Sequence, residues 1–318
     1  MKKILIFGGT GFVGTQVCEK LNRLQCRVTV ATRRGDHARH LLPLPLVDVA
    51  EIDLHDSAAL AALVAGHDAV VNLIAILHGS EDAFQKVHVQ WPLTLVRACR
   101  AAGVRRIVHI SALGASTESA SRYQRSKARG EAALLGSGLD VTVLRPSVMF
   151  GADDKFLNTF ARLQQVFPVI PLAGSRARFQ PVWVGDVADA VVRCLRDDAT
   201  IGEVYEACGP QVFTLKELVR LAGRYAGIHH GQGRPVIALP DALARVQAFF
   251  MELAPGDPML SRDNLDAMKT DNVATGKLPG LQALGITPAS LEAIGPTYLG
   301  ARGLRSGLMA KRQTSGRF

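Results

Sequence analysis

A glycine-rich loop near the amino terminus constrains this chain more than any other feature. A short apolar run at residues 4–7 leads into the loop, and the apolar periodicity of residues 12–24 then predicts a helix. Glycine allows a tight turn and lets backbone N–H groups approach a pyrophosphate at the positive end of a helix. A plain strand-to-helix turn is the alternative. The loop therefore predicts a dinucleotide site with these contacts: Gly8, Thr10, Gly11, Phe12, Val13 and Gly14.

Strand-like and helical runs alternate from the loop to about residue 150. Expected strands cover residues 4–7, 27–31, 49–53, 69–76, 106–111 and 141–145, and expected helices cover 12–24, 57–65, 87–102 and 121–135. Such alternation is typical of βαβ units around a parallel sheet. We therefore predict an α/β fold, a Rossmann-type doubly wound parallel sheet in residues 1–150, completed by parts of 179–208. Residues 151–300 should form a smaller, mostly helical cap with the substrate region, and 301–318 a basic tail.

The tip of the second expected strand indicates which nucleotide is bound. An acid at this place would bind the ribose 2′-hydroxyl of NAD, but the sequence has Arg33 and Arg34. Two guanidinium groups suit a 2′-phosphate, so NADP(H) is favoured over NAD(H). The alternative is a solvated basic loop, and Asp36 lies nearby. Asp53, at the end of the third expected strand, could meet the adenine edge or cap the helix that follows.

A serine, a tyrosine and a lysine suggest a reaction centre. Ser111 ends the fifth expected strand, and Tyr123 and Lys127 share one face of the next helix. A lysine cation there should lower the pKa of the tyrosine and make it a usable proton donor, while the serine hydroxyl binds a substrate carbonyl. These groups would support hydride transfer between a nicotinamide and a carbonyl or alcohol carbon. The alternatives are cofactor binding without turnover, or two surface residues.

Charge and cysteine usage exclude several classes. The net charge is +9, and residues 301–318 contribute much of it because they hold five basic residues and no acid. The five cysteines form no CxxC pair, which argues against a disulfide framework and a zinc site. No targeting segment, membrane span or basic-aromatic pattern for nucleic acid is expected. We therefore expect a cytoplasmic protein, or one peripheral at the inner face of a membrane, with no metal.

Three motifs together resemble the short-chain dehydrogenase/reductase superfamily: the glycine loop, Ser111 and the Tyr123/Lys127 pair. The segment Leu144-Arg145-Pro146-Ser147 fits the superfamily loop that faces the nicotinamide, and Asp186-Val187-Ala188 resembles the extended, nucleotide-sugar-epimerase-like members. The resemblance implies that Lys127 also holds the nicotinamide ribose. It implies further cofactor contacts at Leu54, Leu73, Ile74, Ala75 and Pro146.

A closer resemblance extends over roughly residues 1–300. It is carried by Asn72-Leu73-Ile74, by residues 156–160, 171–175 and 180–184, by Ser261-Arg262-Asp263-Asn264 and by Pro279-Gly280-Leu281. These segments look like the NADPH-binding accessory subunit family of respiratory complex I (alpha subcomplex subunit nine). The resemblance implies a tightly held, structural NADPH and a partner in a respiratory or quinone-related assembly. Because no targeting presequence is expected, the chain looks more like a bacterial relative, for which membership of a complex I is not implied.

Three further features each have a simple structural interpretation. The apolar helix expected at residues 240–251 could cover a hydrophobic substrate or lie in a membrane interface, but packing on the cap core is favoured. His229 and His230 fit a loop better than a metal site. Asp153 and Asp154 fit a cap for the next helix better than an acid pair.

Two hypotheses follow. The first is an NADP(H)-dependent oxidoreductase that acts on a small, possibly hydrophobic carbonyl, alcohol or quinone-related substrate. The second is a non-catalytic NADPH-binding subunit, or an assembly or biosynthesis factor, of a respiratory complex I or ubiquinone-related assembly.

Overall fold

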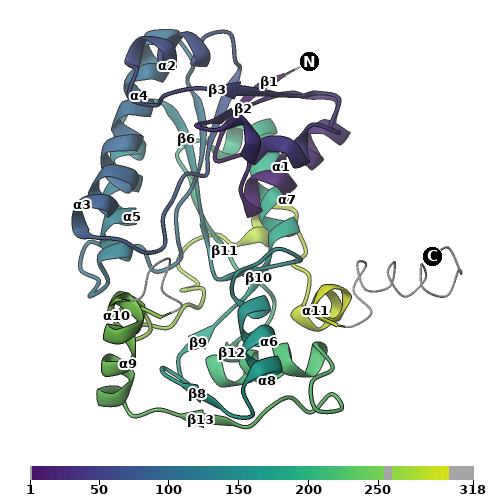
Figure 1. Cartoon of the computed structure of the whole chain (residues 1–318). Helices are drawn as coiled ribbons and strands as arrows, with labels where there is room; N and C mark the ends of the chain where they lie inside the picture. Colours follow the sequence, from purple (N-terminus) through teal and green to yellow (C-terminus); the bar gives the residue numbers. More distant parts are fainter. Residues whose placement is uncertain (1, 254–259, 301–318) are drawn as a thin grey trace, which may run out of the picture. The chain divides into compact units, whose positions relative to one another are not determined.

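The computed structural model describes residues 2–253 and 260–300 (Figure 1). Two compact units form within the chain. Of the described residues, the first unit comprises 2–146, 184–207 and 275–287, and the second comprises 147–183, 208–253, 260–274 and 288–300. The predicted basic tail at residues 301–318 lies outside the described residues.

A seven-stranded sheet forms the first unit. Its strand order is β11-β6-β5-β4-β1-β2-β3, and every pairing is parallel. The strands are β1 (Lys3–Phe7), β2 (Arg27–Thr32), β3 (Val47–Glu51), β4 (Ala69–Asn72), β5 (Arg106–Ile110), β6 (Asp140–Pro146) and β11 (Val204–Ala207). The order reverses direction at β1, and the carboxyl ends of parallel strands at such a point form the usual ligand crevice of an open sheet. The predicted doubly wound sheet is confirmed.

Helices cover both faces of this sheet (Figure 1). They are α1 (Phe12–Arg23), α2 (Ser57–Val64), α3 (Glu81–Phe84), α4 (Trp91–Ala102), α5 (Arg122–Leu135) and α7 (Val184–Arg196). Helix α1 packs beside α7, and α4 packs beside α2 and α5. Shorter turns are the 3-10 helices at Gly35–Leu41, Asp198–Thr200 and Leu281–Leu284, and a π-helix at Gln85–Gln90.

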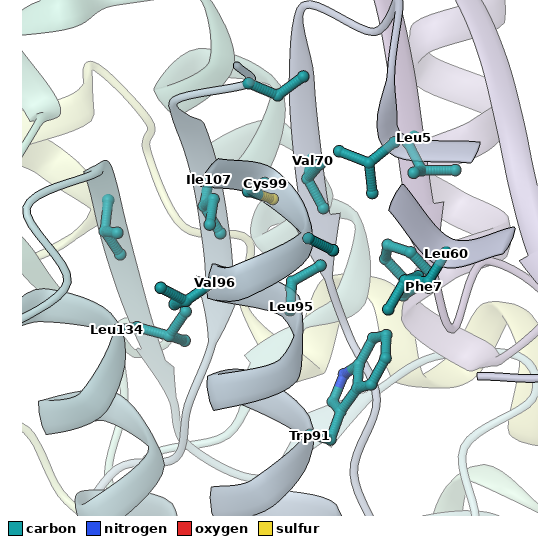
Figure 2. Close-up of a cluster of buried hydrophobic side chains, with 14 of the residues drawn as sticks. Leu5, Phe7, Leu60, Val70, Trp91, Leu95, Val96, Cys99, Ile107 and Leu134 are labelled. Atoms are coloured by element: carbon teal, nitrogen blue, oxygen red, sulfur yellow. The ribbon is translucent and has the colours of Figure 1, made fainter. Parts of the chain in front are cut away.

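The core of the first unit lies between the sheet and the α2, α4 and α5 face (Figure 2). Leu5, Val70 and Ile107 come from neighbouring strands, and Leu95 comes from α4; all four are fully buried. Each such side chain contributes about 1.5–3 kcal/mol through burial. The central strands β1 and β4 read as apolar runs because both of their faces are covered.

The second unit combines helices with short strands. Its strands pair as β7 (Met149–Phe150) with β10 (Val182–Trp183), β9 (Arg178–Phe179) with β12 (Phe213–Thr214), and β8 (Ile170–Leu172) with β13 (Val236–Ala238). Its helices are α6 (Leu157–Val166), α8 (Leu215–Tyr225), α9 (Asp241–Leu253), α10 (Arg262–Ala267) and α11 (Leu291–Leu299). Buried side chains of α6, α8 and α11 form its main core.

Candidate nucleotide-binding and catalytic site

The glycine loop between β1 and α1 has no room for side chains at two of its positions. A Cβ atom at Gly14 would lie 2.4 Å from the Gly8 carbonyl oxygen, and one at Gly9 would lie 2.8 Å from both methyl groups of Val30. Gly11 is the N-cap of α1, and no side chain caps the helix there. The first N–H groups of α1 are thus left to a ligand, so the loop fits a nucleotide pyrophosphate.

Gly8 holds the loop against the end of β4. Its φ of +83° lies in the left-handed region, and a Cβ there would lie 3.1–3.2 Å from backbone atoms of Leu73 and Ile74. The resemblance implied nucleotide contacts at Leu73, Ile74 and Ala75, and the structure places the first two beside the glycine loop. Thr10, Phe12 and Val13 are half-buried in or just after the loop.

A buried amide fixes this end of β4. The Asn72 Oδ1 accepts hydrogen bonds from Trp91 Nε1 at 3.0 Å and from the Ile74 N–H at 3.3 Å. Its Nδ2 donates to Nδ1 of His109 at 3.1 Å, which leaves the proton of the neutral imidazole on Nε2. Burial, with Lys127 as a smaller cause, holds the pKa of His109 well below its usual value. Asn72 therefore connects β4, β5 and the start of α4.

The tip of β2 leads into the two arginines, as the sequence indicates, but an acid from the neighbouring strand β3 lies beside it. The Arg33 and Arg34 side chains are exposed, and neither guanidinium has an ion pair or hydrogen bond within the described part of the chain. The Glu51 Oε2, at the end of β3, accepts a hydrogen bond from the Gly35 N–H at 3.0 Å. Together with Asp36, the residues Arg34, Gly35 and Glu51 line a cavity of about 290 Å³. The pairing of β2 with β3, rather than proximity in the sequence, places Glu51 beside Arg34.

Asp53 lies beyond β3, which ends at Glu51 rather than at residue 53. Its Oδ1 accepts from the His55 N–H at 2.9 Å, while the cap of α2 is Asp56, which accepts from the N–H groups of Ala58 and Ala59. The alternative role of Asp53 as a helix cap is therefore wrong. Its role at the adenine edge, with Leu54 next to it, stays a prediction.

Ser111 presents a buried polar atom without a partner. It follows β5, its N–H donates to the Leu144 carbonyl at 2.7 Å, and its side chain is almost fully buried. Its Oγ has no hydrogen-bond partner among the residues that the structure describes. A buried hydroxyl without a partner costs free energy unless a ligand or water completes it. Pro146 lies close by, since its carbonyl accepts from the Leu113 N–H at 2.9 Å.

Tyr123 and Lys127 lie on α5, as predicted, but their ionisation differs from the expectation. Burial raises the pKa of Tyr123 to about 12, where the sequence reasoning expected Lys127 to lower it. Burial also lowers the pKa of Lys127 to about 8, against the opposing effect of Glu131. The Lys127 Nζ donates to the Ile110 carbonyl at 2.7 Å. Desolvation therefore sets the direction of the pKa shift at both residues.

A π-helix positions the α5 face, and sequence reasoning did not find it. His88, within Gln85–Gln90, accepts at Nε2 from the Ile76 N–H at 3.1 Å, so Nδ1 carries the proton and donates to Ser126 Oγ at 2.8 Å. The Ser126 hydroxyl donates to the Tyr123 carbonyl at 2.7 Å. Burial, with a smaller effect of Lys127, lowers the pKa of His88 to about 3, so the imidazole stays neutral. The chain of bonds fixes the turn of α5 that carries Tyr123.

Ring contacts and a glycine bring the same elements close together. The Tyr123 ring lies edge-to-face with the rings of His88 and Phe84, at centroid distances of 5.5 and 6.1 Å. A Cβ at Gly130 would lie 1.8 Å from the His88 carbonyl oxygen, so only glycine fits there. No periodicity signal marks a π-helix, because it differs from an α-helix by one residue in one turn.

The second unit holds the remaining residues that the sequence singled out. Asp154 is buried and accepts from the N–H groups at the start of α6 and from the Tyr298 hydroxyl at 2.8 Å, which confirms its capping role. His229 and His230 lie in a turn after α8, as predicted. No group of residues that could hold a metal occurs among the described residues.

Helix α9 is more exposed than the favoured interpretation predicted. Only Ala244 and Ala248 are buried, while a stripe of larger apolar side chains stays in solvent: Leu243 57%, Val246 53%, Phe250 64% and Leu253 67% exposed. The spacing of three and four residues places them on one helix face. Packing of this helix on the cap core is therefore wrong for its large side chains. Within the described ranges, no helix is long and apolar enough to cross a membrane.

The fold and the loop define a Rossmann-type NAD(P)-binding protein, and comparison with known families agrees. The sequence pattern of the NAD dependent epimerase/dehydratase family matches residues 4–208, and the chain belongs to this family. It is 31% identical to NADH dehydrogenase [ubiquinone] 1 alpha subcomplex subunit 9, mitochondrial, of Arabidopsis thaliana, over 92% of this chain and 76% of that protein. The Mus musculus protein of that name is 31% identical over 90% of this chain and 77% of its own length.

Solved structures share the fold. An NADPH-dependent quinone oxidoreductase from Escherichia coli, solved with NADPH, superposes with a TM-score of 0.72 and 22% identity, over 92% of this chain and 98% of that chain. A dTDP-glucose 4,6-dehydratase from Streptomyces venezuelae, solved with NAD, has a TM-score of 0.71 and 21% identity, over 93% and 95%. The predicted short-chain dehydrogenase/reductase type of fold and the similarity to the complex I subunit are both confirmed.

Proposed function

We propose that the chain binds NADP(H) and acts as an oxidoreductase on a carbonyl, alcohol or quinone-related substrate. The observation that supports nucleotide binding is the tight glycine loop between β1 and α1. Among Gly8, Gly9 and Gly14 in this loop, two positions leave no space for a Cβ atom. The preference for NADP(H) is supported by the unpaired guanidinium groups of Arg33 and Arg34 at the tip of β2. A 2′-phosphate would satisfy both with charge-assisted hydrogen bonds.

Three side chains support the reaction. A bound nicotinamide nucleotide supplies or accepts a hydride. The unpartnered Ser111 hydroxyl can donate to a substrate carbonyl, and Tyr123 can hold the proton that the substrate oxygen gains or loses. Lys127 can hold a ribose hydroxyl through its remaining N–H groups while it stays bonded to the Ile110 carbonyl. The raised pKa of Tyr123 suits a group that keeps its proton until the substrate oxygen takes it.

The nucleotide preference predicts the behaviour of an Arg33→Ala/Arg34→Ala double variant. We expect its Kd for NADPH to rise about 30-fold or more, because two charge-assisted contacts are lost, while its Kd for NADH changes less than about three-fold. Titration calorimetry with each nucleotide measures both constants. An Arg27→Ala variant is the matched control, since Arg27 is exposed at the opposite end of β2. An equal loss of NADPH and NADH affinity in the double variant contradicts the proposal.

A second candidate function is a non-catalytic NADPH-binding subunit. It is favoured by the similarity to proteins named as subunits of NADH dehydrogenase [ubiquinone], and by the exposed apolar stripe of α9. In this function the nucleotide stays bound and unreacted, and the chain associates with a membrane-bound respiratory or quinone-related assembly. Such a role places it in the cytoplasm, peripheral to the inner face of the membrane.

The α9 stripe predicts association with lipid surfaces. We expect the protein to co-sediment with vesicles of phosphatidylglycerol and phosphatidylcholine, and a Leu243→Glu/Phe250→Glu variant to bind at least about ten-fold less. A Val166→Glu variant, at a side chain that is 74% exposed at the end of α6, should bind as the wild type does. If all three proteins bind equally, or none binds, α9 is not a membrane contact.

A further inference from the structure

Groups of opposite charge lie together at the tip of β2, where the ribose of the nucleotide is expected to bind. Arg33 and Arg34 follow directly after β2, and Glu51 is the last residue of the neighbouring strand β3. Resting on the proposed function, that the chain binds NADP(H), we propose that Glu51 sets the selectivity between NADPH and NADH by opposing the two arginines. It moderates a preference that the arginines alone would make much stronger.

The backbone of the tip is closed by two side chains. The Thr32 hydroxyl donates to the Arg34 carbonyl at 3.0 Å and accepts from the Arg34 N–H at 3.2 Å. The next N–H, that of Gly35, donates to Glu51 Oε2. The Gly35 N–H would otherwise be a ready donor to a phosphate oxygen at this place. Glu51 therefore takes a donor and adds a negative charge at the same point.

The charge of Glu51 is not compensated by an ion pair. Asp36 lines the same cavity, but Arg39 pairs with it at 2.9 Å. No cation pairs with Glu51 within residues 2–253 and 260–300. The side chain is exposed, so its carboxylate can turn toward the cavity of about 290 Å³ that it shares with Arg34.

The two nucleotides respond differently to this arrangement. A phosphate monoester carries about −1.5 to −2 charge at neutral pH and is repelled by the carboxylate. A ribose 2′-hydroxyl is neutral and can donate a hydrogen bond to it. Glu51 thus weakens NADPH binding and leaves NADH binding intact, so both nucleotides can occupy one site.

The test compares Glu51→Gln with the wild type by titration calorimetry, using NADPH and NADH as probes. The glutamine oxygen can keep the bond from the Gly35 N–H, so the variant removes only the charge. We expect the Kd for NADPH to fall about five-fold and the Kd for NADH to change less than two-fold. A Glu51→Ala variant, which also frees the Gly35 N–H, should gain at least as much NADPH affinity.

Asp48→Asn is the matched control, because Asp48 is exposed on the same strand and loses the same charge three residues earlier. It should leave both constants unchanged. An equal gain in Asp48→Asn and Glu51→Gln, or a parallel shift for both nucleotides, overturns the role of Glu51. If wild type and both Glu51 variants prefer NADPH to the same degree, the selectivity proposal fails while the proposed function stands. If the wild type binds neither nucleotide, the proposed function itself fails.

Discussion

A Gly14→Ala variant is expected to lose NADPH binding by at least about 100-fold. The new Cβ would lie 2.4 Å from the Gly8 carbonyl oxygen and 2.5 Å from the Gly9 Cα, which are both backbone atoms of the same loop. No flexible side chain can move aside, so the loop must open or α1 must shift. Either movement removes the N–H groups that would surround the pyrophosphate. Overpacking of this kind also costs about 1–3 kcal/mol of folding free energy.

A Gly11→Ala variant is the control, because it replaces a glycine of the same loop without a close contact to the backbone. A Cβ at Gly11 would meet only the Gly8 carbonyl oxygen, at an ordinary 3.4 Å, and its φ of −87° suits any residue. The melting temperature of the Gly11→Ala variant should match that of the wild type, whereas that of Gly14→Ala should fall by several degrees. Calorimetric titration with NADPH and a thermal melt of each variant provide the two readouts. Normal NADPH affinity in Gly14→Ala would show that this loop is not the pyrophosphate site.

Local signals in the sequence predicted the sheet and the glycine loop well. Strands β1 and β4 are buried on both faces, so each appears as an apolar run, and the loop glycines follow the first strand directly. Boundaries were less accurate: β3 runs over Val47–Glu51, although residues 49–53 were expected. That shift hid Glu51, because as an interior strand residue it did not mark a site.

Tertiary contacts determine what the sequence could not show at the candidate site. The acid beside Arg34 comes from a strand that is adjacent only in the folded sheet. The π-helix of His88 depends on its fit against Gly130 and Ser126 of α5, which are about 40 residues away. The raised pKa of Tyr123 follows from desolvation by the elements packed around it. In each case the missing information is a neighbour from another element.

A Tyr123→Phe variant separates the two candidate functions. If the chain is an oxidoreductase, turnover should fall by about 10²–10⁴-fold, because the hydroxyl that exchanges a proton with the substrate oxygen is lost. NADPH affinity should stay within about two-fold, since the phenylalanine ring keeps the edge-to-face contacts with Phe84 and His88. The measurement follows NADPH oxidation spectroscopically with panels of ketones, quinones and nucleotide sugars. A Tyr205→Phe variant, buried on β11 of the same sheet, is the control and should turn over normally.

The nucleotide that the wild-type protein retains, and whether a substrate consumes it, is measured first so that the Tyr123→Phe result can be interpreted. Mass spectrometry of the purified chain should identify the retained nucleotide as NADPH, and a substrate of one class should consume it. Normal turnover in Tyr123→Phe would contradict the acid–base role of this hydroxyl. NADPH that stays bound and reduced against every panel, in wild type and variant alike, would contradict the oxidoreductase. That second outcome would favour the non-catalytic candidate function, in which Lys127 stays bonded to the Ile110 carbonyl and the nucleotide is not consumed.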